Sequence, residues 1–364
     1  MQLAIASDDS RAAALLESIA KLCAAHGAQW HSELLVEVVE GSMRVLAPGH
    51  SAGPLISMPT ELLVPITDAQ WADTPDVLQL REPPPAATAL QVDLLEMQAQ
   101  LYNATAKLPW WARRHPARLV EESAEVAAAL APLKPGQLKQ QAPSPVAGFL
   151  ATRSFHWKAD PSQEQGQPVL LPLIDCLNHH HRGAPYWIGD GAMRIRVAQA
   201  GGQECFAHYG HRRDGLDLVL HYGHCDHSTP FAHSAPLDLR VEGVGRIQVE
   251  QQVRRQPAHP QDPPRVTLDA DGLKLSHLCC HLHHPERVQV LLRLALQGSL
   301  RSRGHSPGEA LQLAERGLKA IGEANVRLLQ HLVAAVESSE HPGASALAEA
   351  AQRQASILAA VLGP

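Results

Sequence analysis

The order of strand-forming and helix-forming segments constrains the fold of this 364-residue chain more than any other feature. A short amphipathic helix is expected at 12–27, and β-rich runs broken by Gly/Pro turns occupy 34–59. Residues 88–130 are rich in Ala, Leu, Glu and Gln with a helical apolar stripe, and strand patterns return at 169–250. A Pro-rich stretch at 256–264 precedes a helical C-terminal third, in which Ser306-Pro307-Gly308-Glu309 marks a helix start. This order predicts an α+β fold in which a helical insertion divides a β core.

Composition indicates which kinds of partner the protein binds and in which cellular compartment it is expected. The formal charge of −6 and the pI near 6.4 argue against general binding of nucleic acid. Asp8, Asp9 and Arg11 fall where a secretory signal would carry its apolar core, and no run is apolar enough for a membrane span. The six cysteines are scattered through a large chain, which indicates free thiols in a reducing compartment. We therefore expect a cytoplasmic protein without nucleic-acid or membrane partners.

Three motifs in the second β-rich block carry the chemistry. They are LPLIDCLNH at 171–179, GQECFAHYG at 202–210 and LDLVLHYG at 216–223. Tyr209 lies about thirty positions after Asn178, and Tyr222 follows Tyr209 by thirteen. Alone, the first motif fits a polar turn after an apolar strand, and Tyr209 fits a half-buried strand tyrosine. The three motifs in order and in register are more specific than any one of them.

With these motifs the chain resembles SET-domain protein methyltransferases of the Rubisco large-subunit lysine methyltransferase-like class. The resemblance implies a SET-type β core with a threaded (pseudoknot) segment, a helical insertion and an all-helical C-terminal domain. The implied divisions are 1–80 for the first part of the core, 81–147 for the insertion, 148–255 for the second part of the core and 265–364 for the substrate-binding domain. Residues 132–147, rich in Pro, Gln and Lys, read as a linker at the end of the insertion.

The resemblance implies transfer of a methyl group from S-adenosyl-L-methionine to a protein, with a lysine as the expected acceptor. A methyl sulfonium is already electrophilic, so catalysis needs alignment, exclusion of water and a neutral amine more than a strong acid. The resemblance gives Tyr209 the role of orienting the amine and accepting weak C–H···O contacts from the methyl group. It makes Tyr222 the other catalytic tyrosine and a wall of the cofactor site. A histidine acceptor stays open, and so do the target protein and the oligomeric state.

Further residues are expected to hold the cofactor. The resemblance places Asn178 and His179 on the threaded segment against the cofactor, with Asp175 tying that segment together. Arg153, in Thr-Arg-Ser-Phe, resembles the family arginine that pairs with the cofactor carboxylate, and a guanidinium fork suits that geometry. His224 stands where the family carries an adenine-stacking phenylalanine.

One cofactor element departs from the family pattern. The family's Gly-x-Gly loop corresponds to Glu40-Gly41-Ser42-Met43-Arg44, which has a single glycine, so the close backbone approach that a second glycine permits is not given. Glu40 is nevertheless expected at the cofactor. This departure and His224 leave open an alternative from another class, a SET-derived protein-binding module without turnover.

Histidine and cysteine clusters suggest a third alternative, a zinc-binding protein. The clusters are His179-His180-His181, the stretch from His221 through His224 and Cys225 to His227, and the stretch from Cys279 to His284. None has the paired CxxC or the HExxH spacing that marks a zinc site. We therefore expect no metal ligands among them, and S-adenosylmethionine as the cofactor.

Overall fold

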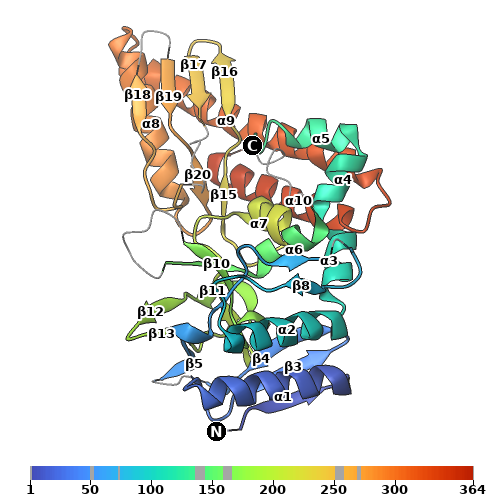
Figure 1. The fold of residues 1–364 in the computed structure, drawn as a ribbon. Helices are drawn as coiled ribbons and strands as arrows, with labels where there is room; N and C mark the ends of the chain where they lie inside the picture. The colour runs from blue at the N-terminus through green and yellow to red at the C-terminus, as the bar shows by residue number, and fades with distance from the viewer. Residues whose placement is uncertain are drawn as a thin grey trace. The chain divides into compact units, whose positions relative to one another are not determined.

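A computed structural model of the chain describes residues 2–49, 53–72, 74–135, 144–158, 166–250, 258–268 and 272–363 (Figure 1). The chain forms two compact units. Unit 1 comprises Met1–Arg113 and Ala142–Tyr209, and unit 2 comprises Arg114–Gln141 and Gly210–Pro364. Each unit has a separate hydrophobic core. None of the helices in the described ranges is long and apolar enough to span a bilayer.

Unit 1 is built mainly from strands. Its elements are β1 (Ala4–Ser7), α1 (Ser10–Ala25), β2 (Gln29–Trp30), β3 (Leu35–Val39), β4 (Ser42–Leu46), β5 (Pro54–Pro59), η1 (Thr60–Leu62), β6 (Val64–Pro65), β7 (Gln70–Trp71), β8 (Leu80–Glu82), α2 (Ala89–Ala104), α3 (Lys107–Arg114), α6 (Pro145–Arg153), β9 (Phe155–Trp157), β10 (Gln167–Leu170), η3 (Ile174–Cys176), β11 (Asn178–Ala184), β12 (Trp187–Gly189), β13 (Ala192–Arg196) and β14 (Glu204–Ala207). The final residue of α3 is the first of unit 2.

The sheet that carries the first two motifs has the order β1-β3-β4-β14-β11. β3 and β4 form an antiparallel hairpin, β14 adds antiparallel to β4, and β11 adds parallel to β14. The β11–β14 register shifts between His179 and Ala184. Gly183 lies in this irregular stretch, where a Cβ atom would meet the Ala207 carbonyl at 2.5 Å, so only glycine allows so close an approach. The first motif therefore lies directly beside the strand that leads to Tyr209.

Helices cover unit 1 because their apolar faces match the core. Asp9 caps α1 by accepting hydrogen bonds from the backbone N–H groups of Arg11 and Ala12, and α1 buries a stripe that includes Leu16 and Ile19. Thr88 and Gln91 form a capping box at the start of α2, which packs against α1 (Figure 1).

Unit 2 combines short strands with long helices. Its elements are α4 (Pro116–Glu122), α5 (Ala124–Leu130), α7 (Gly215–Tyr222), β15 (Phe231–His233), β16 (Leu237–Val241), β17 (Gly245–Val249), β18 (Val266–Leu268), β19 (Gly272–Leu275), β20 (Cys279–His281), α8 (Pro285–Ser302), α9 (Pro307–Glu337) and α10 (Ala344–Leu362). The strands form one sheet in the order β16-β17-β19-β18 and a pair β15-β20. Ser306 and Glu309 form the expected capping box of α9.

The α+β class and the helical C-terminal region are confirmed. Strands β18, β19 and β20 precede the C-terminal helices, and the helical tail begins at Pro285. The predicted linker at 132–147 is wrong at its end, because Ser144 caps α6 and Pro145 occupies its first turn; residues 136–143 lie outside the described residues. The boundaries 1–80, 81–147, 148–255 and 265–364 stay a prediction. The compact units divide the insertion differently, since α4 and α5 pack with helices of unit 2.

Candidate active site

The first motif forms a buried and strained connection between two strands of unit 1. Leu171, Leu173, Ile174 and other apolar residues of the motif are buried, as expected for a core turn. Leu173 has φ +62°, a backbone conformation that side chains other than glycine rarely adopt, and the η3 turn follows it. Strain of this kind persists only where surrounding contacts enforce it, and such positions cluster at functional sites. The turn places Asp175 at the start of the segment that carries Asn178 and His179.

His179 and Tyr209 are in contact across β11 and the end of β14. The Tyr209 backbone N–H donates a hydrogen bond to His179 Nδ1 at 3.1 Å, and the ring centroids are 5.2 Å apart. Because Nδ1 accepts this bond, the neutral imidazole carries its proton on Nε2. The first and second motifs, whose spacing suggested that they act together, are thus in direct contact through His179 and Tyr209.

The Tyr209 hydroxyl has a defined orientation. It donates a hydrogen bond of 2.6 Å to the Leu177 carbonyl, and the side chain is half-buried. With its proton engaged, the phenol oxygen presents lone pairs as acceptors to any group that approaches it. The backbone of the first motif therefore sets the direction in which Tyr209 can accept.

Asn178 joins three strands of the sheet through its side chain. Its Nδ2 donates to the Met43 carbonyl of β4 at 3.1 Å and to Glu204 Oε1 of β14 at 2.9 Å. These bonds hold the start of β11 in place. The amide nitrogen of Asn178 thus has a structural role, and the contact of Asn178 with the cofactor stays a prediction.

Asp175 ties the segment to the helices of unit 1, as expected. Tyr102 of α2 donates its hydroxyl hydrogen to Asp175 Oδ2 at 2.7 Å, and Arg153 Nη1 of α6 lies 3.7 Å from the same oxygen. Burial raises the pKa of Asp175, although Arg153 and the Tyr102 hydrogen bond act in the opposite direction. Burial and the Asp175 charge also raise the pKa of Tyr102 well above its usual range.

Arg153, predicted to pair with the cofactor carboxylate, is paired in the structure with a carboxylate of the protein, that of Asp175. Its guanidinium also lies over the rings of Phe149 and Tyr102, at 5.5 Å and 6.0 Å. In the part of the chain that the structure describes, its buried Nε atom has no hydrogen-bond partner. One side of the guanidinium is therefore paired with Asp175, while an N–H donor of the same group is still unmatched.

Lys107 adds a second cation to this cluster and was missed by sequence reasoning. Burial, together with the nearby Arg153 charge, lowers its pKa to about 8, against the opposing effect of Asp175. At neutral pH the cluster thus holds two cations, Arg153 and Lys107, around one carboxylate. The one sequence signal for Lys107 is its position, because a lysine directly after a helical apolar stripe is unusual.

Glu40 and Gly41 form the tight turn between β3 and β4. Both have positive φ, +50° and +73°, as in a two-residue type I′ hairpin, and the Glu40 backbone N–H donates to Asp8 Oδ2 at 2.7 Å. A Cβ atom on Gly41 would lie 2.6 Å from the Thr105 carbonyl oxygen. The backbone that lies close against Gly41 is therefore that of the chain itself, at the end of α2. This geometry does not favour the predicted cofactor contact at Glu40.

Tyr222 and His224 belong to unit 2, whereas the other predicted site residues belong to unit 1. Tyr222 ends α7, and Gly223 (φ +78°) closes the helix in the left-handed conformation. The Arg213 guanidinium lies over the Tyr222 ring at 5.4 Å, and the His224 ring is 6.1 Å from it. The helix end in the third motif is confirmed, while the roles of Tyr222 and His224 at the cofactor stay a prediction.

A buried ionic network at the start of α7 was also missed. Lys134 Nζ lies 3.2 Å from Asp214 and 2.7 Å from Asp217, and His233 Nδ1 lies 3.3 Å from Asp214. Burial opposes ionisation of Asp214, but the Lys134 ammonium outweighs it and lowers the pKa of the carboxyl. The two His233 ring nitrogens face the oxygens of Asp214 and Ala258. Burial opposes the charged ring, but Cys279 and Asp214 outweigh it and raise the pKa of His233 well above its usual range. Two cations therefore balance two carboxylates.

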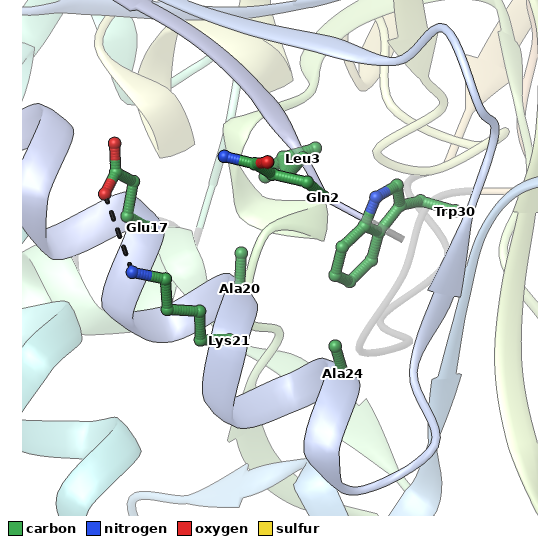
Figure 2. Close-up of a pocket in the computed structure, with 7 residues that line it drawn as sticks. All are labelled: Gln2, Leu3, Glu17, Ala20, Lys21, Ala24 and Trp30. Carbon is green, nitrogen blue, oxygen red and sulfur yellow. Dashed lines mark ion pairs between the residues drawn. The ribbon is translucent and has the colours of Figure 1, made fainter.

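A separate pocket of unit 1 contains none of the predicted site residues. It has a volume of about 360 Å³ and is shown in Figure 2. Gln2, Leu3, Ala20, Ala24 and Trp30 line it beside the ion pair Glu17–Lys21, whose charged atoms are 3.8 Å apart. The pocket is thus distinct from the cluster around Asp175.

Comparisons with known proteins give a likeness in fold. No protein-family model matches the chain, and no curated protein matches it. Among solved structures, it is similar to the SET domain of LSMT bound to lysine and AdoHcy, with 11% identity, coverage of 96% of this chain and 90% of that chain, and a TM-score of 0.40. For the same domain bound to methyllysine and AdoHcy the values are 11%, 96%, 90% and 0.39, and for Rubisco LSMT bound to AdoMet they are 10%, 96%, 91% and 0.41.

At these identities and TM-scores the likeness has no bearing on which residues act. The chemistry of the chain follows from its own side chains.

Proposed function

We propose that this protein is an S-adenosylmethionine-dependent protein methyltransferase that modifies a lysine side chain. The observation that carries the proposal is the clamp on Tyr209. Its backbone N–H is bonded to His179 and its hydroxyl to the Leu177 carbonyl, so two motifs about thirty residues apart form one rigid unit. A tyrosine that is held at its backbone and at its hydroxyl suits a reaction that depends on alignment.

The residues around Asp175 fit the carboxylate end of the cofactor. S-adenosylmethionine, when bound, supplies an electrophilic methyl group. Arg153 has an unmatched Nε–H donor, and with Lys107 it gives the cluster an excess of positive charge over Asp175. A guanidinium binds a carboxylate through charge-assisted hydrogen bonds. Arg153 would therefore hold the amino-acid end, while Glu40 and the Gly41 turn make no comparable cradle.

Tyr209 would act on the lysine amine by orientation. The amine must be neutral to attack, and its N–H group would donate to the Tyr209 oxygen, whose own proton is engaged by Leu177. That hydrogen bond would direct the nitrogen lone pair toward the donor methyl. The same oxygen would accept C–H···O contacts as the methyl group is transferred.

The roles of the remaining predicted residues belong to the same proposal. Tyr222 would form the second wall of the lysine site, His224 would contact the adenine, and Asn178 and His179 would bind the cofactor largely through their backbone. The protein is proposed to act in the cytoplasm on a protein segment.

Methyl transfer to a cell extract tests the proposal. Isotope-labelled S-adenosylmethionine, full-length protein and extract are incubated, and the labelled proteins are hydrolysed for amino-acid analysis. We expect label in methylated lysine and a loss of rate on the order of 100-fold in Tyr209→Phe. Tyr186→Phe, which removes a hydroxyl elsewhere in unit 1, serves as the matched control and should keep the wild-type rate. Label in methylhistidine would move the acceptor to histidine, and a wild-type rate in Tyr209→Phe would refute the role of Tyr209.

The closed turn at Gly41 favours a second candidate, a SET-derived binding module without turnover. A Cβ atom on Gly41 would meet the Thr105 carbonyl, so this glycine faces the backbone of the chain itself. Under this alternative no protein in the extract would be labelled. Capture of a protein from the same extract by both the wild type and Tyr209→Phe would then support a binding role.

A further inference from the structure

Cys225, His227 and Glu349 of unit 2 form a cluster of mixed donors. Their ligand atoms all lie within 4.8 Å of one another, and His227 Nε2 is 3.5 Å from Glu349 Oε1. Cys225 and His227 follow the end of α7, whereas Glu349 lies on α10. The sequence could not indicate this cluster, because Glu349 lies far along the chain from Cys225 and His227, on the last helix.

The backbone beneath the cluster is held in place. Asp226 is buried and accepts hydrogen bonds from the backbone N–H groups of Ser228 and Thr229, both at 2.9 Å. Arg353, one helical turn after Glu349 on α10, donates to the Thr229 carbonyl at 3.2 Å. The loop that carries Cys225 and His227 is therefore fixed to the helix that carries Glu349. On this backbone the three donor atoms already lie within 4.8 Å of one another.

The donor set suits one ion in particular. A thiolate, an imidazole and a carboxylate are the zinc ligands found in proteins, and metal–ligand distances of about 2.0 to 2.3 Å place donor atoms roughly 3.3 to 3.7 Å apart. The His227–Glu349 separation already falls in this range, and Cys225 must close the remaining distance. The charges of a thiolate and a carboxylate together balance Zn²⁺. Three protein ligands leave a fourth position for water.

We propose that Cys225, His227 and Glu349 form a zinc site that joins the loop after α7 to α10. On binding, the Cys225 thiol gives up its proton to solvent and a Zn–S bond forms, with no change of oxidation state. The proposal is independent of the proposed methyl transfer, since it uses none of the residues assigned to that reaction.

The other polar clusters of the described residues do not offer such a site. Asp214, Asp217 and His233 also lie close together, but the Lys134 ammonium occupies the space between their carboxylates. Among the described residues, neither the run His179–His181 nor the run Cys279–His284 brings three ligand atoms close enough together to hold a metal ion. The Cys225 cluster is therefore the place to look for bound metal.

Metal titration of the full-length, tag-free protein tests the site. After treatment with a chelator, the protein is mixed with Zn²⁺, and bound zinc is counted by native mass spectrometry; Co²⁺ serves as a spectroscopic probe. We expect one zinc per chain and, with Co²⁺, a near-ultraviolet thiolate-to-metal charge-transfer band that is absent in Cys225→Ser. His227→Ala should weaken zinc affinity on the order of 100-fold, whereas His331→Ala, at an exposed position of α9, should leave it unchanged.

Glu349→Gln keeps the test decisive if Cys225→Ser fails to fold, because Glu349 is half exposed on α10. This variant should lose zinc while its circular dichroism spectrum stays as in the wild type. The proposal is overturned if chelator-treated protein takes up no stoichiometric zinc. It is equally overturned if uptake is the same in the wild type, His227→Ala and Glu349→Gln, which would indicate an adventitious ion.

Discussion

At the scale of single residues, the neighbours of each side chain decide its role. Tyr209 is useful because its proton is engaged by the Leu177 carbonyl, so its oxygen can only accept. Arg153 is useful for the opposite reason, since pairing with Asp175 leaves a donor of the same guanidinium unmatched. Lys107 shows that burial changes the charge available at a given pH, because its pKa is lowered to about 8. These three environments define the electrostatics of the candidate site.

Replacing Arg153 by Met should weaken binding of S-adenosylhomocysteine by about 10- to 100-fold, because a charge-assisted hydrogen bond to a carboxylate contributes about 1.5 to 3 kcal/mol. The thermal shift produced by S-adenosylhomocysteine, followed over a concentration series, measures the loss. Arg194→Met is the control, since Arg194 forms a surface ion pair with Asp190 instead. Equal shifts in the two variants would remove Arg153 from the cofactor site.

At the scale of elements, buried polar groups position the helices of unit 2. His115 caps α4 by accepting from the Ala117 N–H at Nδ1, and its Nε2 lies 3.3 Å from the His221 carbonyl of α7. The Lys134 network closes the first turn of α7 through Asp214 and Asp217, which also form its capping box. Both groups link segments far apart in the chain, so each should matter for folding more than an exposed residue does.

The His115 environment predicts a dependence of stability on pH. Burial lowers the pKa of His115 to about 4, against a usual value near 6.5 that applies to the unfolded chain. The stability from the neutral ring is therefore complete above pH 6.5 and is lost as the pH falls through 4. His115→Asn keeps a capping oxygen but cannot titrate.

Between pH 7 and pH 4 the free energy of unfolding should thus fall by up to about 3 kcal/mol more in the wild type than in His115→Asn. Urea denaturation at a series of pH values measures the difference. His331→Asn, at an exposed site, controls for loss of a histidine. Parallel pH profiles of the wild type and His115→Asn would show that the ring is not buried in its neutral form.

Lys134→Met tests the ionic network. It leaves two carboxylates against one imidazolium in a buried site, and breaking a buried pair in this way destabilises proteins by about 3 to 5 kcal/mol. Lys319→Met, on the exposed surface of α9, should cost less than about 1 kcal/mol. Chemical denaturation of both variants at pH 7 measures the two losses of stability. Equal midpoints would contradict the role given to Lys134.

At the scale of the whole molecule, the sequence could predict what depends on local pattern. The strand runs before residue 60, the α9 capping box and the helix end at Tyr222 follow from periodicity and capping chemistry over a few positions. Contacts between distant segments have no such signal. No sequence signal near Lys134 indicates Asp214 as its neighbour, and none near Cys225 indicates Glu349. The sequence at Glu40-Gly41 likewise does not indicate whether a ligand or the Thr105 carbonyl lies against the turn.

The register of the motifs is the intermediate case. The spacing of Asn178, Tyr209 and Tyr222 suggested that they act together, and the structure places His179 against Tyr209. Which hydroxyl is oriented, and by which carbonyl, depends on the strained backbone at Leu173 and the η3 turn. Local propensity disfavours that backbone conformation, so the sequence could not indicate it.

Calorimetric titration of the intact wild-type protein with S-adenosylmethionine is the most direct test of the central claim. The account predicts saturable binding of one molecule per chain, competed by S-adenosylhomocysteine. Absence of saturable heat up to millimolar S-adenosylmethionine would contradict it.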